Sequence, residues 1–540
     1  MKIIVADKIS ERGIALLREA GWNVVLPAAA ALPSEIVDAD ALVVRSATKV
    51  TAALLEKAAR LRAIGRAGVG VDNVDVDAAT RRGVLVMNTP GGNSVSVAEH
   101  TLALMLGLAR AVPQANASIH AGKWEKSAFS GTEMRGKTLG LVGLGRVGME
   151  VARRARALEM KVLAHDPFVA PATAAELEVE LVSLDDLLRR SDVISLHTSL
   201  SAQTEKLVDA AAIAKMKKGV RIINCARGEL IDEAALAEAL KSGHVAGAAL
   251  DTFAQEPPKN SPLVGLHNVI ATPHIAGSTA EAQEEVGTAI AQQLRDYLAD
   301  GTIRNAVNMP ALSPEQYRRL RPYLELGERM GAFVAQAAPS RSFTRVRVQY
   351  SGEPAEIGSH VICRSVLVGA LNCVVDEKVN LVNVADETAA RGIVVQETTR
   401  PRGRGYPNTI EVSVSDGGRE FSIEGAVAQD GSPRILALDG ISLESPLEGT
   451  LLLSRNIDVP GVIGRIGTAL GTLGINISTF ALGRRAPAGG AEALALVGLD
   501  GNVNASVVQE ILGLPSVTEA RLVRLPAAPP AAPQASSATS

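Results

Sequence analysis

The chain has few aromatic residues, 3% of its 540, and three cysteines, Cys225, Cys363 and Cys373. Three cysteines without a CxxC pair indicate neither a disulfide framework nor a structural zinc site, so we expect no metal. The formal net charge is −3, which leaves no basic excess to hold the protein on nucleic acid or on an anionic membrane surface. The longest nearly apolar stretch, residues 95–109, contains a glutamate and a histidine and is too short to span a bilayer. The first residues, MKIIVADKIS, have the pattern of a strand rather than of a targeting peptide, so we expect a cytoplasmic location.

Apolar residues make up 47% of the chain and suit helices packed on buried sheets. At about 150 residues per domain, the length predicts three to four domains. Short apolar strands alternate with helical patterns over residues 1–92 and again from Lys137 to Ala282, with a helix expected over 283–299. This alternation predicts two Rossmann-like α/β lobes with parallel sheets and a cleft between them. Residues 97–110 are apolar nearly all round, which predicts a helix buried between domains or between subunits.

The pattern changes after Pro310. Residues 315–335 are predicted to be helical, and residues 343–447 are mostly short strands with Gly-rich polar turns. This stretch has no Gly-rich phosphate loop and no cluster of titratable residues. Residues 450–524 are predicted to fold as strand–helix–strand–strand–helix–strand. The Pro/Ala/Ser-rich tail, residues 526–540, is expected to be disordered.

The strongest single motif is GLGRVG, residues 143–148, between a predicted strand over 138–142 and a predicted helix over 149–158. A GxGxxG motif in this context predicts a dinucleotide-binding loop. Gly143 makes the tight turn, Gly145 lets the backbone approach a pyrophosphate, and Gly148 lets helix and strand pack closely. Asp166 ends the next strand, 18 residues past Gly148. A carboxylate there accepts hydrogen bonds from the ribose hydroxyls and repels a 2′-phosphate, which predicts NAD rather than NADP.

Three later segments each follow a predicted strand and carry a polar residue: residues 224–228, 250–257 and 272–277. Ligands bind at the carboxyl ends of strands in open α/β sheets. Arg227 could clamp a carboxylate with two hydrogen bonds, and His274 could take a hydroxyl proton during hydride transfer. Glu256 beside the histidine would hold its tautomer. These three residues together can oxidise a 2-hydroxy acid, although by residue type alone each could equally be a surface charge or a loop cap.

Four motifs resemble those of the D-isomer-specific 2-hydroxyacid dehydrogenases: GLGRVG, NCARG (224–228), LDTFAQEP (250–257) and PHIAG (273–277). The stretches RSATKV (45–50), GRAGVGVDNVD (65–75) and NTPGGNSVSVAEHTLALML (88–106) are similar to the members of that family that act on 3-phosphoglycerate. The resemblance covers nearly the whole chain. It implies NAD-dependent oxidation of 3-phospho-D-glycerate to 3-phosphohydroxypyruvate, the first step of L-serine biosynthesis.

The resemblance also implies residue roles. Arg227 binds the substrate, His274 is the acid/base and Glu256 is its partner. Beyond the three glycines, the implied cofactor-binding residues are Arg146, Val147, Asp166, Thr198, Cys225, Ala226, Arg227, Asp251, His274, Ile275, Ala276 and Gly277. The implied substrate-binding residues are Arg45, Arg66 and Asn93, and Arg135 is a candidate to reach a neighbouring subunit's site. Cys225 is interpreted as a small loop residue without thiol chemistry. Val69 stands where the family often has threonine, which weakens one cofactor contact.

The domain organisation implied by the resemblance has four parts and the tail. They are a substrate-binding domain (1–94 and 283–309), an NAD-binding Rossmann domain (95–282), an α+β intervening domain of the allosteric substrate-binding type (317–446) and a ferredoxin-like βαββαβ ACT domain (447–525). The ACT-like unit implies L-serine as effector, bound through Asn456, Asp458, Asn476 and the backbone near residues 460–462, in a homo-oligomer that is a dimer or a tetramer.

Three alternatives stay open at this point. The first is another 2-hydroxyacid dehydrogenase that reduces glyoxylate or hydroxypyruvate. The second is an NAD-sensing transcriptional corepressor with the same fold, which would not need the long C-terminal half. The third concerns the last unit, which could promote oligomers without binding serine.

Overall fold

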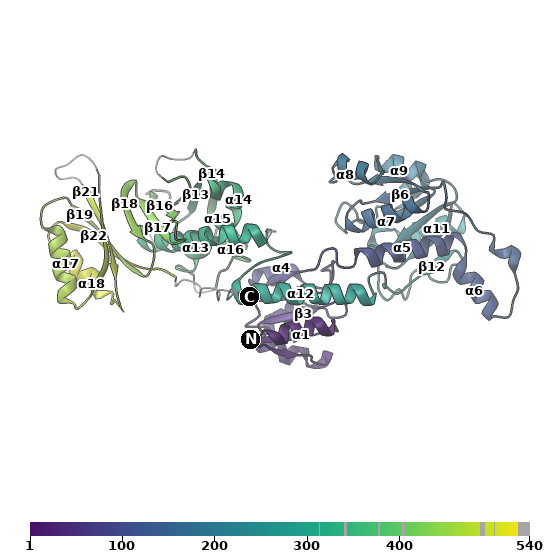
Figure 1. The fold of residues 1–540 in the computed structure, drawn as a ribbon, viewed down its shortest axis with the longest axis horizontal. Coiled ribbons are helices and arrows are strands. Elements are labelled where there is room, and N and C mark those ends of the chain that lie inside the picture. Colours follow the sequence, from purple (N-terminus) through teal and green to yellow (C-terminus); the bar gives the residue numbers. More distant parts are fainter. Residues whose placement is uncertain are drawn as a thin grey trace, which may run out of the picture.

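The computed structural model places four sheets along an elongated molecule (Figure 1). It describes residues 1–310, 312, 314–339, 343–375, 378–401, 406–418, 420–485, 492–501 and 503–526. The predicted disordered tail lies outside the described residues except for Pro526.

The first lobe is a five-stranded parallel sheet with strand order β2-β1-β3-β4-β5. Its strands are β1 (Lys2–Val5), β2 (Asn23–Val25), β3 (Ala41–Val44), β4 (Ala63–Arg66) and β5 (Leu85–Met87). Its helices are α1 (Glu11–Glu19), η1 (Ala29–Ala31), α2 (Leu32–Glu35), η2 (Ile36–Asp38), α3 (Ala52–Lys57), α4 (Val76–Arg81) and α12 (Ala280–Asp300). All four residues of β3 are buried, as expected for a parallel sheet covered on both faces. Helix α12 begins three residues before the predicted start, because the Thr279 side chain accepts from the Ala282 amide and caps it.

The second lobe is a seven-stranded parallel sheet with order β12-β11-β10-β9-β6-β7-β8. Its strands are β6 (Thr138–Val142), β7 (Lys161–His165), β8 (Glu180–Leu181), β9 (Val193–Leu196), β10 (Val220–Asn224), β11 (Val245–Leu250) and β12 (Val269–Ala271). Its helices are α5 (Ser94–Ala109), α6 (Val112–His120), η3 (Lys126–Phe129), α7 (Arg146–Ala157), α8 (Pro171–Glu176), α9 (Leu184–Arg190), α10 (Ala210–Lys215), η4 (Gly228–Leu230) and α11 (Glu233–Lys241). The strand order reverses between β6 and β9, and such reversal points form ligand-binding crevices.

The third unit is a six-stranded sheet with order β14-β13-β15-β16-β17-β18. Its strands are β13 (Arg345–Ser351), β14 (Val394–Thr399), β15 (Thr409–Ser415), β16 (Glu420–Val427), β17 (Pro433–Leu438) and β18 (Ile441–Pro446). Its helices are α13 (Pro314–Ala337), α14 (Glu353–Ile357), α15 (Ser359–Leu371) and α16 (Val384–Ala390). The expectation of mostly short strands over 343–447 is therefore wrong for residues 353–371 and 384–390. Helix α15 is buried on nearly all sides, which removes the polar face that would reveal a helical period.

The fourth unit has the predicted strand–helix–strand–strand–helix–strand order, and its sheet order is β20-β21-β19-β22. Its elements are β19 (Thr450–Ile457), α17 (Val462–Thr472), β20 (Ile477–Arg484), β21 (Glu492–Leu499), α18 (Ser506–Leu512) and β22 (Val517–Arg524). Leu451, Leu453 and Leu494 join the core of the third unit, so one face of this sheet packs against that unit. The opposite face, with Leu452, packs under α17 and α18. The third and fourth units thus share a continuous core.

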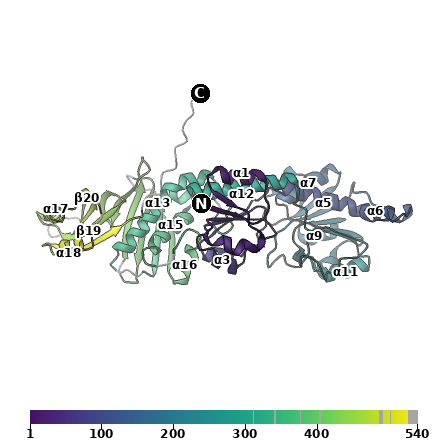
Figure 2. The ribbon, with the colours of Figure 1, turned by 90° about the horizontal axis from the view of Figure 1, so that it is seen from below.

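The second lobe and the fourth unit lie at opposite ends of the molecule, with the first lobe and the third unit between them (Figures 1 and 2). Helices α5 and α12 connect the two lobes. No single helix in the described part of the chain has the length and apolarity to cross a membrane, while α5 and α6 together meet those criteria as a pair bent by 64°.

Candidate active site

The glycine-rich loop follows β6 and leads into α7, which begins at Arg146, three residues earlier than predicted. Gly143 has φ +98°, and a Cβ there would lie 2.5 Å from the His197 carbonyl oxygen. A Cβ on Gly148 would lie 2.4 Å from the Gly143 carbonyl oxygen. At Gly145, by contrast, no described atom lies within 4 Å of the Cβ position. The loop is therefore closed where strand and helix must pack and open where a pyrophosphate would approach, so the residues present fit NAD.

Asp166 directly follows β7 and stands beside the same loop. Its Oδ2 accepts from the Leu144 amide at 2.8 Å and its Oδ1 from the Phe168 amide at 2.9 Å. The carboxylate is thus fixed at the edge of the glycine-rich turn. On the other side of the turn, the Thr198 amide nitrogen lies 3.1 Å from the Cβ position of Gly143. Asp166 and Thr198 therefore flank the loop from the two strands adjacent to β6, where the sheet order reverses.

His274 and Glu256 form a pair, as predicted from their motifs. His274 Nδ1 lies 2.8 Å from Glu256 Oε2, and Glu256 Oε1 accepts from the Phe253 amide at 3.2 Å. Because a carboxylate only accepts, Nδ1 carries the hydrogen in this pair, and Nε2 of the neutral ring is free to take a proton. The His274 side chain is 49% exposed, and its backbone has φ +54°. This conformation is uncommon for a non-glycine residue and indicates a loop fixed by its surroundings.

Asp251 fixes that loop. It is fully buried, and its carboxylate accepts from the Ile275 amide at 2.9 Å, the Ala276 amide at 2.8 Å and the Thr272 hydroxyl at 2.6 Å. Burial alone would raise the pKa of Asp251, but these hydrogen bonds and one with His100 outweigh it and hold the pKa below its usual value. The observed contacts thus give Asp251 a positioning role, and its contact with the cofactor stays a prediction.

Arg227 reaches across from the second lobe to the first. Its Nε donates to Asp72 Oδ2 at 2.9 Å, and its NH2 lies 2.8 Å from the same oxygen. The Cβ position of Gly70 lies 2.0 Å from Arg227 NH2, so the guanidinium lies directly against the first-lobe loop. The predicted carboxylate clamp is therefore engaged by Asp72 in this structure.

Arg66 and Arg45 lie near this contact at the ends of β4 and β3. Burial, and then repulsion from Arg227 and Arg45, lowers the pKa of Arg66 to about 10, while Asp72 partly offsets the shift. The Arg66 Nε is buried without a hydrogen-bond partner in the described structure. Three arginines predicted to bind substrate thus gather in one place, which is an arrangement suited to an anion carrying more than one charge.

Asn93 lies against the His274 loop, since a Cβ on Gly277 would be 2.6 Å from Asn93 Nδ2.

Burial raises the pKa of the Cys225 thiol to about 12, in line with the interpretation that it performs no thiol chemistry. Arg135 pairs with Glu159 of its own chain at 2.9 Å on the surface.

The three predicted effector residues occupy separate positions in the fourth unit. Asn456 is 3% exposed, and its Oδ1 has no hydrogen-bond partner among the described residues. Asp458 Oδ2 lies 3.4 Å from Arg484 Nε, and Asn476 donates to Asp500 at 2.6 Å. Their joint role in effector binding stays a prediction.

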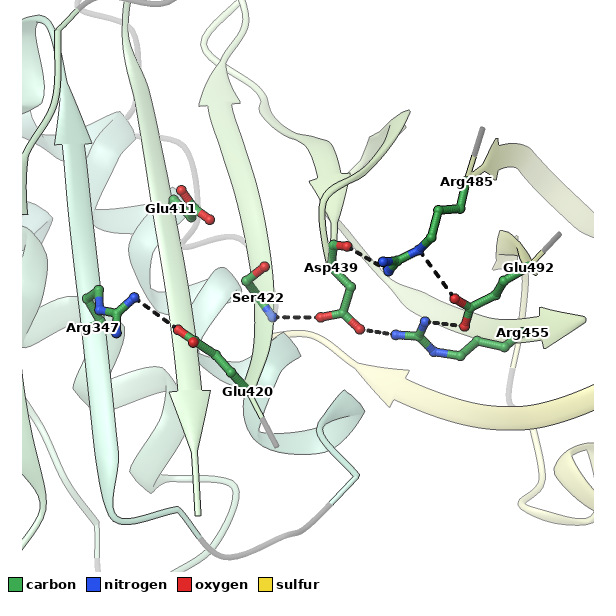
Figure 3. A pocket seen from close by; sticks show the side chains of 8 residues that line it. All are labelled: Arg347, Glu411, Glu420, Ser422, Asp439, Arg455, Arg485 and Glu492. Atoms are coloured by element: carbon green, nitrogen blue, oxygen red, sulfur yellow. Dashed lines mark hydrogen bonds and ion pairs between the residues drawn. The ribbon is translucent and has the colours of Figure 1, made fainter. Parts of the chain in front are cut away.

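A cavity of about 640 Å³ is lined by residues of both the third and the fourth unit (Figure 3). Arg455 is 5% exposed there and pairs with Asp439, with Glu492 at 2.7 Å and with Glu519 at 3.2 Å. Arg485 and Arg347 also lie within pairing distance of carboxylates, Glu492 at 3.5 Å and Glu420 at 3.2 Å. The arginines that line this cavity are thus paired within the chain, and the pair of Arg455 with Asp439 connects the fourth unit to the third.

Several residues of the site were missed by sequence reasoning. Asp72 accepts a hydrogen bond from Arg227 across the cleft, and Gly70 leaves room for the Arg227 guanidinium. His100 and Thr272 contact the Asp251 carboxylate. Asp7 holds the Arg45 loop through the Arg45 amide at 2.6 Å and the Thr48 hydroxyl at 2.7 Å. Asp7 and Asp72 each follow a strand of the first lobe, which is the signal that could have identified them.

The chain is similar to known proteins over nearly its whole length. Residues 102–276 match the model of the D-isomer specific 2-hydroxyacid dehydrogenase NAD binding domain, and residues 319–439 match that of the D-3-phosphoglycerate dehydrogenase intervening domain. The chain is 43% identical to D-3-phosphoglycerate dehydrogenase of Methanocaldococcus jannaschii, over 97% of this chain and 100% of the relative. The Bacillus subtilis enzyme of the same name is 40% identical over the same shares. The chain belongs to the D-3-phosphoglycerate dehydrogenase family. It is therefore an oxidoreductase that acts on a CH–OH group with NAD.

Solved structures match part of the chain. The apo-structure of D-lactate dehydrogenase from Escherichia coli is similar with a TM-score of 0.51 and 30% identity, over 57% of this chain and 100% of that one. A glyoxylate reductase from Paecilomyes thermophila gives a TM-score of 0.52 and 31% identity, over 57% and 98%. The family therefore combines a 2-hydroxyacid dehydrogenase fold with an intervening domain in the C-terminal half.

Proposed function

We propose that this chain oxidises 3-phospho-D-glycerate to 3-phosphohydroxypyruvate, the first step of L-serine biosynthesis. The observation that carries the proposal is that three neighbouring strands, β10, β11 and β12, are followed by Arg227, Glu256 and His274. Glu256 and His274 form a pair, and Arg227 lies with Arg45 and Arg66 in one cationic cluster. An acid/base beside a strongly cationic pocket suits a hydroxy acid that carries both a carboxylate and a phosphate.

In the proposed reaction, His274 Nε2 takes the proton of the substrate hydroxyl while its Nδ1–H stays hydrogen-bonded to Glu256. NAD bound at the glycine-rich loop would supply the hydride acceptor. Gly143, Gly145 and Gly148 with the N-terminus of α7 would hold its phosphates, and Asp166 its adenosine ribose. The other cofactor contacts proposed on the basis of the motifs come from the residue pairs Arg146–Val147 and Cys225–Ala226, Thr198, Asp251 and the loop 274–277.

Substrate binding is proposed to exchange one carboxylate for another at Arg227. In the free chain Asp72 occupies its Nε and NH2. A substrate carboxylate would take over these donors, while Arg45 and Arg66 bind the phosphate and Asn93 lies alongside. Arg66 carries a buried Nε without a partner among the described residues, so a phosphate oxygen would give this donor an acceptor.

The experiment is an NADH absorbance assay with 3-phospho-D-glycerate, D-glycerate, D-lactate and glycolate. We expect 3-phosphoglycerate to have the highest kcat/KM. Arg66→Gln should lower the preference for 3-phosphoglycerate over D-glycerate by about 10- to 100-fold, as expected for a lost charge-assisted hydrogen bond. Equal turnover of the phosphorylated and unphosphorylated acids by the wild type would contradict the proposal.

The alternative activities are less well supported. A dehydrogenase specific for glyoxylate or hydroxypyruvate has no phosphate to place among Arg45 and Arg66. A corepressor would need neither the His274–Glu256 pair nor the matched intervening domain of residues 319–439. Turnover of 3-phosphoglycerate distinguishes both alternatives from the proposal.

We further infer that the fourth unit is an ACT domain that binds L-serine. Its βαββαβ order and its Asp458 beside the start of α17 support this inference. Asp458 would pair with the ammonium group, the amides after Pro460 would meet the carboxylate, and Asn456 and Asn476 would complete the site. Because this unit shares its core with the third unit, serine binding should be measured by calorimetry on the full chain. An absence of heat at millimolar serine would leave the unit as an oligomerisation module.

We also infer a homo-oligomer in which α5 and α6 contact a second copy. Helix α6 projects away from the second lobe (Figure 1), and the surface of this region exposes Val95, Leu106, Val112, Ile119 and Trp124. Exposed large apolar side chains gathered on one region mark contact surfaces between proteins. Light scattering should show at least a dimer, and Ile119→Asp should shift it towards the monomer; an unshifted mass would place the contact elsewhere.

A further inference from the structure

The segment Lys378–Asn383 of the third unit inserts into the first lobe. It lies between α15 and α16, and its Val382 side chain is 4% exposed. Val382 belongs to the first-lobe core with Leu85, Met87 and Met309 rather than to the core of its own unit. Leu381, the residue before it, packs against both cores. In both views of the molecule the third unit lies beside the first lobe (Figures 1 and 2).

A hydrogen bond fixes the same contact at the neighbouring position. Asn380 Nδ2 donates to the Gly83 carbonyl oxygen at 2.8 Å. Gly83 has φ +68°, in the turn between α4 and β5, and a Cβ there would lie 2.5 Å from Asn380 Nδ2. Gly83 thus allows both the turn and the close approach of the third unit.

Hydrogen bonds within the third unit hold the segment in its conformation. The Asn380 side-chain oxygen accepts from the Val382 amide at 2.9 Å, and Asn383 Oδ1 accepts from the Asn380 amide at 2.8 Å. From α15, Asn372 donates to the Val379 carbonyl at 2.9 Å and Arg364 to the Leu381 carbonyl at 2.9 Å. Such local side-chain to backbone bonds present Val382 in one conformation, so little entropy is lost when it docks.

The docking position lies next to the strand that leads into the substrate loops. Leu85 and Met87, two of the three residues of β5, belong to the same core cluster as Val382. Directly after β5, the Asn88 side chain donates to the Val69 carbonyl at 2.6 Å, and the Thr89 amide donates to the Gly68 carbonyl at 2.9 Å. These two bonds join the residues that follow β5, on the way to Asn93, to the loop that follows Arg66.

We propose that Val382 and Asn380 are positioning residues, through which the C-terminal half of the chain sets the substrate-binding loops of the first lobe. The inference rests on the proposed function for its substrate. It gives the fourth unit a physical route to the cleft, because that unit shares a core with the third unit and pairs with it through Arg455 and Asp439. The route is a chain of packed contacts between two sites at opposite parts of the molecule.

The test compares full-length variants in steady-state kinetics and in NADH binding. Val382→Asp should raise KM for 3-phosphoglycerate about tenfold, within the range observed for residues that couple separate sites. The kcat should stay within about twofold and the Kd for NADH unchanged, because the contacts that carry the proposal join the segment to the first lobe and not to the NAD-binding lobe. Val382→Ile should behave as the wild type.

Two glycine variants distinguish the effect of losing the Asn380–Gly83 contact from the effect of backbone strain at a glycine with positive φ. Gly83→Ala should raise KM like Val382→Asp, since the new methyl displaces Asn380. Gly21→Ala is the matched control, because Gly21 in the same lobe also has a positive φ, +74°, and no described atom lies within 4 Å of its Cβ position. Hydrogen exchange over residues 85–92 and 303–309 should become faster in Gly83→Ala and Val382→Asp and not in Gly21→Ala.

Two outcomes would overturn the proposal: an unchanged KM in both Val382→Asp and Gly83→Ala, or an equal rise in Gly83→Ala and Gly21→Ala. Failure of the proposed function is a different result, since it would appear as absence of 3-phosphoglycerate turnover in the wild type. In that case hydrogen exchange, which needs no substrate, still tests whether Val382 and Asn380 stabilise the first lobe.

Discussion

Replacing Asp251 by asparagine tests how the catalytic loop is held. The change keeps the size of the side chain but removes its charge and one of its two acceptor oxygens. In the wild type the two oxygens accept from the Ile275 and Ala276 amides at 2.9 and 2.8 Å. An asparagine would face at least one of these buried N–H groups with a second donor, so that amide would lose its partner.

The expected magnitude follows from these contacts. A hydrogen bond to a charged group contributes about 1.5–3 kcal/mol, and a buried donor left unpaired costs about 1–3 kcal/mol. We therefore expect Asp251→Asn to weaken the loop by about 3 kcal/mol, which corresponds to about 100-fold faster hydrogen exchange at Ile275 and Ala276. The His274 side chain on this loop would lose its fixed position, and kcat should fall by about 100-fold.

The stability that Asp251 adds to the loop should be present at neutral pH and lost at acidic pH. The hydrogen bonds hold the pKa of Asp251 below its usual value against the opposing effect of burial. A carboxyl group with a lower pKa in the folded state adds stability that is complete above its unfolded pKa and is lost as pH falls through the folded value. The difference between wild type and Asp251→Asn should be complete at neutral pH and shrink below about pH 4.

Asp185→Asn serves as the control, because Asp185 is a surface carboxylate of the same lobe paired with Lys215. It should change neither the exchange rates nor kcat. Unchanged exchange at Ile275 and Ala276 in Asp251→Asn, together with a kcat within about twofold of the wild type, would refute the reasoning.

Three further predictions concern single residues. His274→Ala should lower kcat by about 10²- to 10⁴-fold with nearly unchanged NADH affinity, measured by stopped-flow and fluorescence titration; near-normal turnover would remove His274 from the acid/base role. Asp166→Ala should reduce the preference for NAD over NADP in steady-state assays. A wild type that already uses both cofactors equally would show that Asp166 does not exclude the 2′-phosphate of NADP. Asp458→Ala should abolish calorimetric L-serine binding by the full chain while kcat without serine stays the same, and serine heat that survives the change would place the binding site elsewhere.

The architecture of the two lobes could be predicted because their strands are buried on both faces and bounded by turns. Local patterns predicted helices over residues 11–20 and 52–59, and the structure has α1 over Glu11–Glu19 and α3 over Ala52–Lys57. The strand and helix that flank the glycine-rich loop followed from local patterns as well. Strand β8 was missed because two residues at a sheet edge carry no periodicity. Helix α15 was missed because a helix buried all round has no polar face, and its β-branched residues favour strands as well.

The candidate site was predictable only where the two partners follow neighbouring strands of one sheet. His274 and Glu256 lie close together because both follow neighbouring strands of one sheet, β12 and β11. The pairing of Arg227 with Asp72 joins residues 155 positions apart on different lobes, and no local pattern encodes it. The insertion of Val382 into the first-lobe core was equally hidden, because a buried valine does not reveal which of two cores it joins.

The central claim is that the His274–Glu256 pair and the arginine cluster together oxidise a phosphorylated 2-hydroxy acid. The most direct measurement is NADH formation from NAD and 3-phospho-D-glycerate, with wild type and His274→Ala side by side and D-glycerate as the unphosphorylated control. The account predicts rapid NADH formation by the wild type with 3-phosphoglycerate, much slower formation with D-glycerate, and loss of both rates in His274→Ala. Absence of 3-phosphoglycerate-dependent NADH in the wild type, or a rate that His274→Ala leaves unchanged, would contradict it.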